Sequence, residues 1–343
     1  MKEKDFFKKL FNHLPYGVML LNKEGEVVFK NKTAGILLYD IFSGKSGSNF
    51  LEEVKHYPVK FAVSDSLLKK SSFRREFELS ADSIVQIDGE PYDDQGCNNG
   101  VLLSIYSISQ FKKLEKHNRQ FVANVSHELK TPLTAIIGYI ETLIDSDNLD
   151  EKMISKFLQV IKKNSLRLSQ IVNDLLTLSS LEKDEASTEG VSLIEGKIRP
   201  VVIEAISACE YKANAKKVKI DFQAEEDFSC LLNAGLLEQA IVNLIDNAIK
   251  YSPESSRVKV SVSGSFKNIV IRIIDSGPGI PSKYHARIFE RFFSVDKARS
   301  RTMGGSGLGL SIVKHIVINH HGQVFVEDNT PNGAAFTILI PKL

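Results

Sequence analysis

Two long stretches with apolar residues at helical spacing constrain the fold of this 343-residue chain more than any other feature. In the first, apolar residues recur every three or four positions from Phe121 to Leu143, which predicts an amphipathic helix. After a polar break at residues 145–148, a second run has apolar residues at two heptad positions. These are Ile154, Ile161, Leu168, Leu175, Phe157, Ile171 and Leu178. Together the runs predict an antiparallel helical hairpin.

This hairpin has more apolar surface than two helices can bury against each other. Leu158, Val172 and Leu181 widen the stripe of the second helix beyond a two-stranded seam. Two such hairpins would close into a four-helix bundle. We therefore expect a homodimer.

The region before the hairpin predicts an α+β domain with an antiparallel sheet. Its strand candidates lie at residues 17–21, 26–29, 75–79, 83–87 and 101–108. The polar, Gly- and Pro-containing stretch 88–96 predicts a loop, and residues 31–34 predict the start of a helix. No catalytic grouping of side chains occurs in this region.

The region after the hairpin alternates helices and strands and predicts an α/β sandwich, with one helical layer on a mixed sheet. Its strand candidates lie at residues 218–222, 258–262, 269–274, 323–327 and 335–340. The expected architecture is thus multidomain. The domains are expected at residues 1–110, 111–185 and 186–343.

Charge and cysteine content exclude several classes of protein. Lys+Arg number 44 and Asp+Glu 42, without a basic block, so nucleic acid is not expected as a partner. The 3 cysteines are widely spaced, which favours neither disulfides nor a zinc site. No stretch approaches the ~20 apolar residues of a membrane span. We expect a cytoplasmic protein, or a segment of a membrane-anchored one whose spans lie outside this sequence.

Three motifs in the third region carry chemistry. On the predicted helix 236–250, Asn243, Asn247 and Lys250 project from one side, and one amide oxygen there suffices as a Mg²⁺ ligand beside substrate phosphates; a solvated face is the alternative. Asp275 follows a strand and precedes glycines, a place where a carboxylate can accept from an exocyclic amine; a tight turn is the alternative.

The third motif is a glycine-rich loop, Gly304-Gly305-Ser306-Gly307-Leu308-Gly309, at the start of an apolar helix. Such a loop presents unpaired amides to phosphate. It is not a Rossmann motif, because no strand immediately precedes it, and it lacks the Lys-Ser/Thr of a Walker loop.

In this order the motifs resemble the successive boxes of the ATP-binding domain of sensor histidine kinases. The segments that carry the resemblance are 243–251, Asp275-Ser276-Gly277-Pro278-Gly279, Phe289-Glu290-Arg291-Phe292-Phe293 and 305–310. The resemblance implies the GHKL (Bergerat) ATP-binding fold of DNA gyrase, Hsp90 and MutL, and ATP and Mg²⁺ as cofactors.

The resemblance also implies roles for individual residues. Asn247 would be the Mg²⁺ ligand with Asn243 beside it, Asp275 would read the adenine amino group, and residues 294–309 would form a lid over the phosphates. The remaining residues that it assigns to the nucleotide site are Lys250, Tyr251, Gly277, Gly279, Gly305, Gly307, Leu308 and Gly309.

A histidine in the first helical run stands in a second box of the same family. His127 is two residues from both Val125 and Leu129, so it points away from the apolar seam. Glu128 is adjacent, where a carboxylate can hold one ring nitrogen protonated, and Pro132 interrupts the helical hydrogen bonds just after it.

The segment 121–133 resembles the phosphoacceptor box, which implies transfer of the ATP γ-phosphoryl group to His127 with Glu128 as general base, and then to an aspartate of a cognate response regulator. Thr131, four residues on, implies an additional phosphatase activity towards that regulator.

Two further observations qualify this resemblance. Many relatives carry Arg after the paired aromatic residues, where this chain has Ser294; Lys297, Arg299 or Arg301 could replace that cation, or the rate could be low. The first region resembles a PAS sensor domain in the segments 14–18 and 31–34, which implies an unknown sensory ligand or partner.

Two other functions remain open at this stage. A GHKL-type ATPase that performs mechanical work would use the same pocket but has no use for the His127 box. A kinase-inactive signalling scaffold or phosphatase would be consistent with Ser294.

Overall fold

The computed structural model describes residues 9–94, 98–146, 150–186, 190–296, 306–330 and 332–342. The chain forms two compact units, Met1–Gln120 and Phe121–Leu343. Among the described residues, no helix combines the length and the apolar character needed to cross a bilayer.

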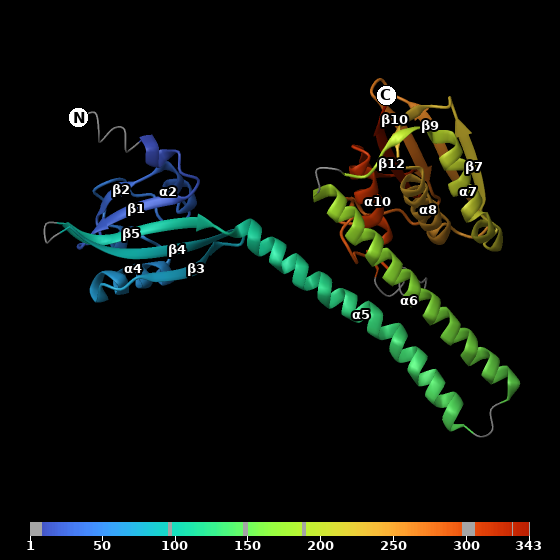
Figure 1. The fold of residues 1–343 in the computed structure, drawn as a ribbon, viewed down its shortest axis with the longest axis horizontal. Helices are drawn as coiled ribbons and strands as arrows, with labels where there is room; N and C mark the ends of the chain where they lie inside the picture. The colour runs from blue at the N-terminus through green and yellow to red at the C-terminus, as the bar shows by residue number, and fades with distance from the viewer. Residues whose placement is uncertain are drawn as a thin grey trace. The chain divides into compact units, whose positions relative to one another are not determined.

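The first unit is built on a five-stranded sheet with the order β2-β1-β5-β4-β3 and only antiparallel pairings between neighbours (Figure 1). The predicted antiparallel α+β unit is confirmed. Its strands are β1 (Gly17–Asn22), β2 (Val27–Lys30), β3 (Phe73–Ser80), β4 (Ser83–Asp94) and β5 (Asn98–Ser107), and its helices are α2 (Lys32–Leu37), α3 (Phe50–Glu53) and α4 (Tyr57–Lys69).

Alternating burial and one capping residue explain this arrangement. Val101, Leu103 and Ile105 are fully buried at alternate positions of β5, so one face of the sheet meets the helices. Asn31 caps α2, since its Oδ1 accepts from the backbone N–H of Ala34 at 2.8 Å and of Val18 at 2.9 Å. The cap therefore ties the predicted helix start to β1.

The predicted loop at 88–96 is wrong for residues 88–94, which continue strand β4. These residues pair with β5 up to Asp94↔Asn98, whereas pairing with β3 ends at Gly89. Pro91 thus lies where β4 has one neighbour, a position in which a missing N–H is tolerated. Asp88 is held by Arg74, whose Nε is 3.0 Å from both carboxylate oxygens.

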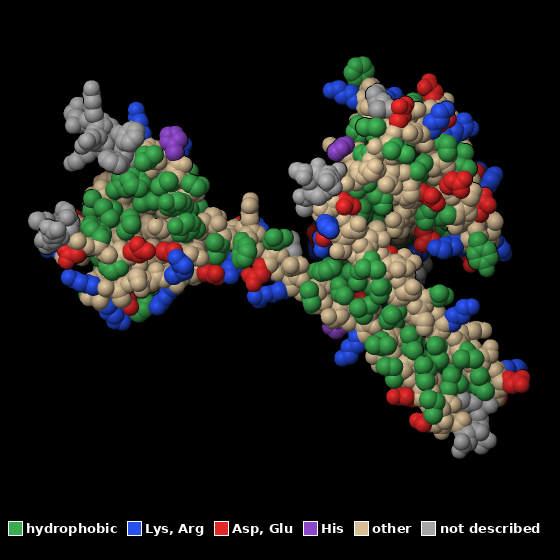
Figure 2. Space-filling view, viewed as in Figure 1, with side chains coloured by type: hydrophobic (Ala, Val, Ile, Leu, Met, Phe, Trp, Pro, Cys, Tyr) green, Lys and Arg blue, Asp and Glu red, His purple; other side chains and the backbone are tan. Residues whose placement is uncertain are grey.

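Helices α5 (Ser109–Asp145) and α6 (Glu151–Ala186) form the predicted antiparallel hairpin, here called the stem. The rings of Tyr139 and Phe157 pack across it with centroids 5.2 Å apart. Hydrophobic side chains nevertheless gather on its surface (Figure 2). Those more than a third exposed include Leu133, Ile137, Ile140, Ile154, Leu158 and Val172.

The rest of the second unit is the predicted α/β sandwich. Its sheet has the order β11-β12-β10-β9-β7, and it is mixed because β7 is parallel to β9. Helices α7, α8 and α10 form one layer on it (Figure 1). The elements are α7 (Ile198–Ala215), β7 (Lys219–Ala224), α8 (Ala234–Tyr251), β9 (Arg257–Gly264), β10 (Asn268–Ile274), α10 (Gly309–Asn319), β11 (Gln323–Asp328) and β12 (Ala334–Pro341).

Two short strands, β6 (Ile194–Lys197) and β8 (Ser229–Leu232), form a separate antiparallel pair that the sequence did not predict. The end of α6 also packs on the sandwich, since Leu178 and Leu181 belong to the same buried core as Leu244. The stem and the sandwich therefore share apolar contacts at this end.

Candidate functional site

A cavity of about 480 Å³ lies between helix α8, the loop after strand β10 and the start of helix α10. Its size is typical of small-molecule sites. We call it the nucleotide cavity, because most of the residues predicted to contact a nucleotide line it. They are Asn243, Asn247, Lys250, Tyr251, Asp275, Gly279, Gly307 and Gly309.

Helix α8 supplies polar groups to this cavity because its two faces differ. Leu237, Ile241 and Leu244 are fully buried in the core, and the opposite side carries Asn243 and Asn247, one turn apart and partly exposed. The packing of the apolar face thus fixes the direction in which both amide groups point.

Lys250 and Tyr251 end this helix beside the cavity. Burial lowers the pKa of Lys250, and the positive charges of Arg167 and Lys212 lower it further, against an opposing effect of Asp246. The Lys250 Nζ lies 5.4 Å from the centre of the Tyr251 ring. The amine is therefore held in a partly desolvated site where an anionic ligand would favour its charged form.

Asp275 is firmly positioned at the edge of the cavity. It is 6% exposed, and its Oδ1 accepts from the N–H groups of Gly277 at 2.8 Å and Ala334 at 3.1 Å. Burial raises the pKa of Asp275, while these two hydrogen bonds act in the opposite direction. Because both bonds go to Oδ1, the second oxygen is the one offered to a ligand.

Glycines make this placement possible. A Cβ on Gly333, where φ is +119°, would lie 2.0 Å from the carbonyl oxygen of Asp275. One on Gly277 would lie 2.9 Å from the Asp275 carboxylate and 3.0 Å from the Tyr251 carbonyl oxygen. Side chains at these positions would displace the carboxylate, so the glycines are required by its close packing.

The glycine-rich loop reaches the cavity immediately before α10. Gly307 has φ +75°, and a Cβ there would lie 2.9 Å from the Cα of Phe292, whose N–H donates to the Gly307 carbonyl at 2.9 Å. The first turn of α10 starts at Gly309, where the unpaired N–H groups of a helix favour anions.

Two of the predicted nucleotide residues that the structure describes, Gly277 and Leu308, do not line the cavity. Gly277 lies behind Asp275 and contacts it through its backbone. Leu308 is fully buried in the core, so only its backbone could serve a ligand. Gly305, together with Lys297, Arg299 and Arg301, lies outside the described residues.

The stem contributes residues to the cavity that the sequence analysis missed. Gln170 and Asp174 of α6 line it, and Asp174 is 7% exposed. Asp174 accepts from Gln170 Nε2 at 2.7 Å and from Ser306 Oγ at 2.8 Å. Burial raises the pKa of this carboxyl group. No local pattern marks such residues, because the contact forms only when stem and sandwich pack.

His127 lies on α5 with its side chain exposed, as predicted. Glu128 forms an ion pair with Arg167 of α6, with Oε2 and Nη2 2.8 Å apart. The Thr131 hydroxyl donates to the His127 carbonyl at 3.0 Å. None of these three predicted residues lines the cavity, so the structure shows two separate parts of a site.

Further contacts hold the end of α6 on the sandwich. Arg291 forms an ion pair with Glu182, and its guanidinium lies 4.9 Å from the centre of the Phe121 ring. His315 Nδ1 is 2.6 Å from Glu185. Ser294, which also lines the cavity, donates to the Asp296 carbonyl at 3.0 Å.

Comparisons with known proteins match both parts of this site. Residues 117–184 match the family described as His Kinase A (phospho-acceptor) domain. Residues 233–343 match the family described as histidine kinase-, DNA gyrase B-, and HSP90-like ATPase. The chain carries the kinase core of a two-component sensor histidine kinase. His127 lies within the first match and the α8 and glycine motifs lie within the second.

Individual relatives agree with this kinase core. The sensor-like histidine kinase SenX3 of Mycolicibacterium smegmatis is 39% identical over 234 residues, which are 68% of this chain and 60% of the relative. The sensor protein kinase WalK of Staphylococcus saprophyticus is 29% identical over 99% of this chain and 55% of its own length. The chain thus spans little more than half the length of these relatives.

Among solved structures, the histidine kinase ThkA, crystallised in complex with the response regulator protein TrrA, has 21% sequence identity and a TM-score of 0.54. The match covers 98% of both chains. At this level of identity, the comparison shows that the two chains share a fold.

Proposed function

We propose that this chain is an ATP-dependent protein-histidine kinase, which transfers the γ-phosphoryl group of ATP to His127. One observation carries the proposal: an exposed histidine on α5 and a cavity lined by Asn247, Lys250 and Asp275 occur in one compact unit. A mechanical ATPase would need the cavity and not the histidine.

In the proposed reaction, the lone pair of one His127 ring nitrogen attacks the γ-phosphorus, and Glu128 takes the proton from the other ring nitrogen. The bond between the γ-phosphorus and its bridging oxygen breaks, with the electron pair leaving on ADP. Such transfers depend mainly on positioning and on neutralisation of charge. Asp275 positions the adenine in this scheme, and Lys250 and the start of α10 face the phosphates.

The donor set of the cavity fits Mg²⁺. This ion prefers few protein oxygens together with substrate phosphates, and Asn247 and Asn243 offer two amide oxygens. The described residues contain no cluster of three or more His, Cys, Asp or Glu side chains that would form a dedicated metal cage. Asn247 would hold the ion. When bound, Mg²⁺ would neutralise part of the negative charge of the phosphates.

A response regulator is the proposed acceptor of the phosphoryl group. The exposed position of His127 leaves room for a second protein, and a response regulator is the partner in the ThkA complex. Thr131 lies one turn beyond His127 on α5, which supports the further proposal that the chain also dephosphorylates the regulator.

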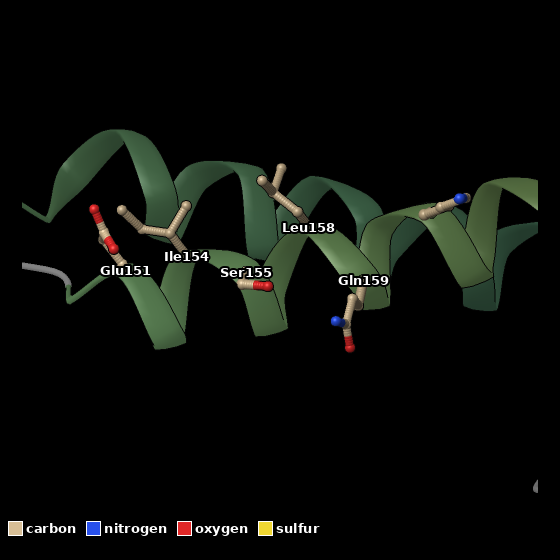
Figure 3. A pocket seen from close by; sticks show the side chains of 6 residues that line it. Glu151, Ile154, Ser155, Leu158 and Gln159 are labelled. Carbon is tan, nitrogen blue, oxygen red and sulfur yellow. The ribbon is translucent and has the colours of Figure 1, made fainter.

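We also propose that the stem pairs with a second copy of the chain. Figure 3 shows Ile154 and Leu158 beside a shallow depression on α6, where they project one turn apart. They are 37% and 53% exposed, and burying them in a four-helix bundle would remove this apolar surface from water.

The first unit is the proposed sensory part, a PAS-like domain. This role in regulation, through an unidentified ligand or partner, is supported by three features. They are the antiparallel sheet, the capped helix α2 and a sequence without catalytic groupings.

Labelling with γ-³²P-ATP and Mg²⁺ tests the kinase proposal. We expect an acid-labile, alkali-stable label on the wild-type protein that is lost in His127→Ala, which should retain ADP binding. Asn247→Asp should lose the label too, because it changes the charge and the oxygen set at the Mg²⁺ position.

Other outcomes would favour the alternative functions. ATP hydrolysis without any labelled protein would support a GHKL-type ATPase. Absence of both signals would support a kinase-inactive scaffold or phosphatase, the reading that Ser294 favours. Unchanged labelling of Asn247→Asp would remove that residue from the Mg²⁺ site.

A further inference from the structure

An ion pair inside the stem lies directly beside the proposed phosphoacceptor. Glu128 is the neighbour of His127 in sequence, and its Oε2 is 2.8 Å from Nη2 of Arg167 on the facing helix. The two side chains are only 18% and 17% exposed. Such a sheltered pair is screened far less than an ion pair on the surface.

Arg167 has hydrogen-bonding capacity beyond this pair. A guanidinium carries five N–H donors in a planar fork. The Nε–H group of Arg167 is buried and meets no hydrogen-bond acceptor among the described residues. A buried donor of this kind calls for a partner, and the planar fork lets an arginine bind a carboxylate on one edge and a phosphoryl oxygen on another.

Arg167 also lies on the side of α6 that faces the nucleotide cavity. It shares one helical face with Gln170 and Asp174, three and seven positions later, and both of these line the cavity. Its positive charge is among the causes that lower the pKa of Lys250, a cavity residue, although burial is the larger cause. Arg167 thus contacts the proposed base Glu128 and lies on the helical face that continues to the cavity, although its own side chain does not line the cavity.

A cation from the stem would add to the positive charge that Lys250 provides in the cavity. Ser294 occupies the position after Phe293, and its hydroxyl donates to the Asp296 carbonyl, so this position provides no positive charge. A transferring phosphoryl group spreads negative charge over three oxygens, and a positioned arginine stabilises it strongly.

We propose that Arg167 is a catalytic residue of the phosphotransfer reaction, which binds Glu128 with one edge of its guanidinium and the transferring γ-phosphoryl group with its remaining N–H donors. The inference rests on the proposed function and adds to it a cation supplied by the stem. Arg167 forms and breaks no covalent bond; it neutralises charge on the phosphoryl oxygens while the proton moves to Glu128.

Initial rates of His127 labelling, measured on the full chain over a range of ATP concentrations, test this role. We expect Arg167→Met to lower the maximal rate by about 100-fold or more, in line with arginines that contact a transferring phosphoryl group. The affinity for ADP should change less than about twofold, because ADP lacks the γ-phosphoryl group that Arg167 would contact. Lys156→Met, an exposed cation on the same helix, is the matched control and should label at the wild-type rate.

A double variant separates a catalytic role from mere anchoring of Glu128. If Arg167 contacts the phosphoryl group, Glu128→Gln with Arg167→Met should label at least tenfold more slowly than Glu128→Gln alone. Equal rates for the double and single variants would show that Arg167 acts only through Glu128 and would overturn the proposal. Wild-type labelling by Arg167→Met would overturn it as well.

Arg167→Lys keeps the charge and the length of the side chain, so it preserves the stem if Arg167→Met unfolds it. Because lysine lacks the fork, we expect its rate to fall about tenfold, and a wild-type rate would contradict the proposal. If the wild-type protein itself acquires no label, the proposed function fails instead, and the two failures are thereby distinguished.

Discussion

The α/β sandwich and the stem use the same kinds of apolar residue in opposite ways. In the sandwich, Leu244, Ile271 and Val313 are fully buried, and this packing fixes helix α8, which carries Asn243 and Asn247. In the stem, Leu158 and Leu133 are about half exposed, and His127 projects from a helix with few neighbours. The part that forms the nucleotide cavity is therefore densely packed, whereas the part that carries the proposed phosphoacceptor leaves apolar surface exposed.

The largest expected effect tests this contrast directly. Leu244→Ala should lower the free energy of unfolding by about 3 kcal/mol, because it leaves a cavity in a packed core. Leu158→Ala should cost less than about 0.5 kcal/mol in dilute monomeric protein, since its side chain is already half solvated. Urea unfolding followed by circular dichroism measures both.

Equal losses for the two leucine variants would break the comparison and show that Leu158 is covered. A loss for Leu158→Ala that grows with protein concentration would indicate that a second copy of the chain covers it.

The next effect concerns ligand binding alone. Asp275→Asn should weaken ADP binding by about 2 to 3 kcal/mol, because an amide donor would face the adenine amino group in place of a carboxylate. Isothermal titration calorimetry measures the change. Asp221→Asn, on strand β7 away from the cavity, is the control and should bind ADP normally. Unchanged affinity in Asp275→Asn would place the adenine elsewhere.

A third test uses the pH dependence of the free energy of unfolding, which should respond to a histidine buried in the sandwich. His320 is 1% exposed, and burial lowers its pKa, against the hydrogen bond that Nδ1 donates to the Ile316 carbonyl at 2.7 Å. Its Nε2 accepts from the Asn233 N–H at 2.9 Å, which holds that nitrogen unprotonated. Below about pH 6.5, the pKa of an unfolded histidine, His320 is protonated in the unfolded chain. In the folded sandwich its imidazole stays neutral to lower pH.

The free energy of unfolding should therefore fall as pH drops below about 6.5, by at most about 1.4 kcal/mol per pH unit from this group. His320→Gln should flatten the decrease measured in urea titrations between pH 7.5 and 5.5. An identical pH profile in the variant would show that other groups dominate.

The smallest effect is expected where the stem meets the sandwich. Glu182 and Arg291 are 31% and 33% exposed, so solvent screens their attraction and we expect a coupling of about 0.5 to 1 kcal/mol. A double-mutant cycle with Glu182→Gln and Arg291→Met in low salt measures it. Zero coupling would mean that this ion pair does not help to join the two parts.

The main elements of the fold could be predicted from the sequence because their apolar residues recur at regular spacing over many positions. Apolar spacing gave both stem helices, and Asn31 marked the start of α2. Strands β6 and β8 were missed because each has only four residues and, unlike the equally short β2, neither is a run of β-branched and aromatic residues. The extension of β4 through Pro91 was mistaken for a loop, because a sequence does not show that pairing with β3 ends at Gly89.

The candidate site was predictable where one local motif supplies each group. Asn247, Asp275 and Gly307 each stand in a short, recognisable segment, and the structure brings them to one cavity. Gln170, Asp174 and Gly333 could not be found in this way. Their roles depend on which surfaces meet in three dimensions, and their sequence surroundings resemble any helix or turn.

Pro132 gives the acceptor helix a built-in point of bending. Without an N–H group it cannot donate to the carbonyl of Glu128, four residues earlier, and its ring crowds that carbonyl. Bending α5 at this turn costs less than bending it elsewhere. A twist applied anywhere along α5 should accordingly concentrate within one helical turn of His127, where a small rotation changes which way the imidazole faces.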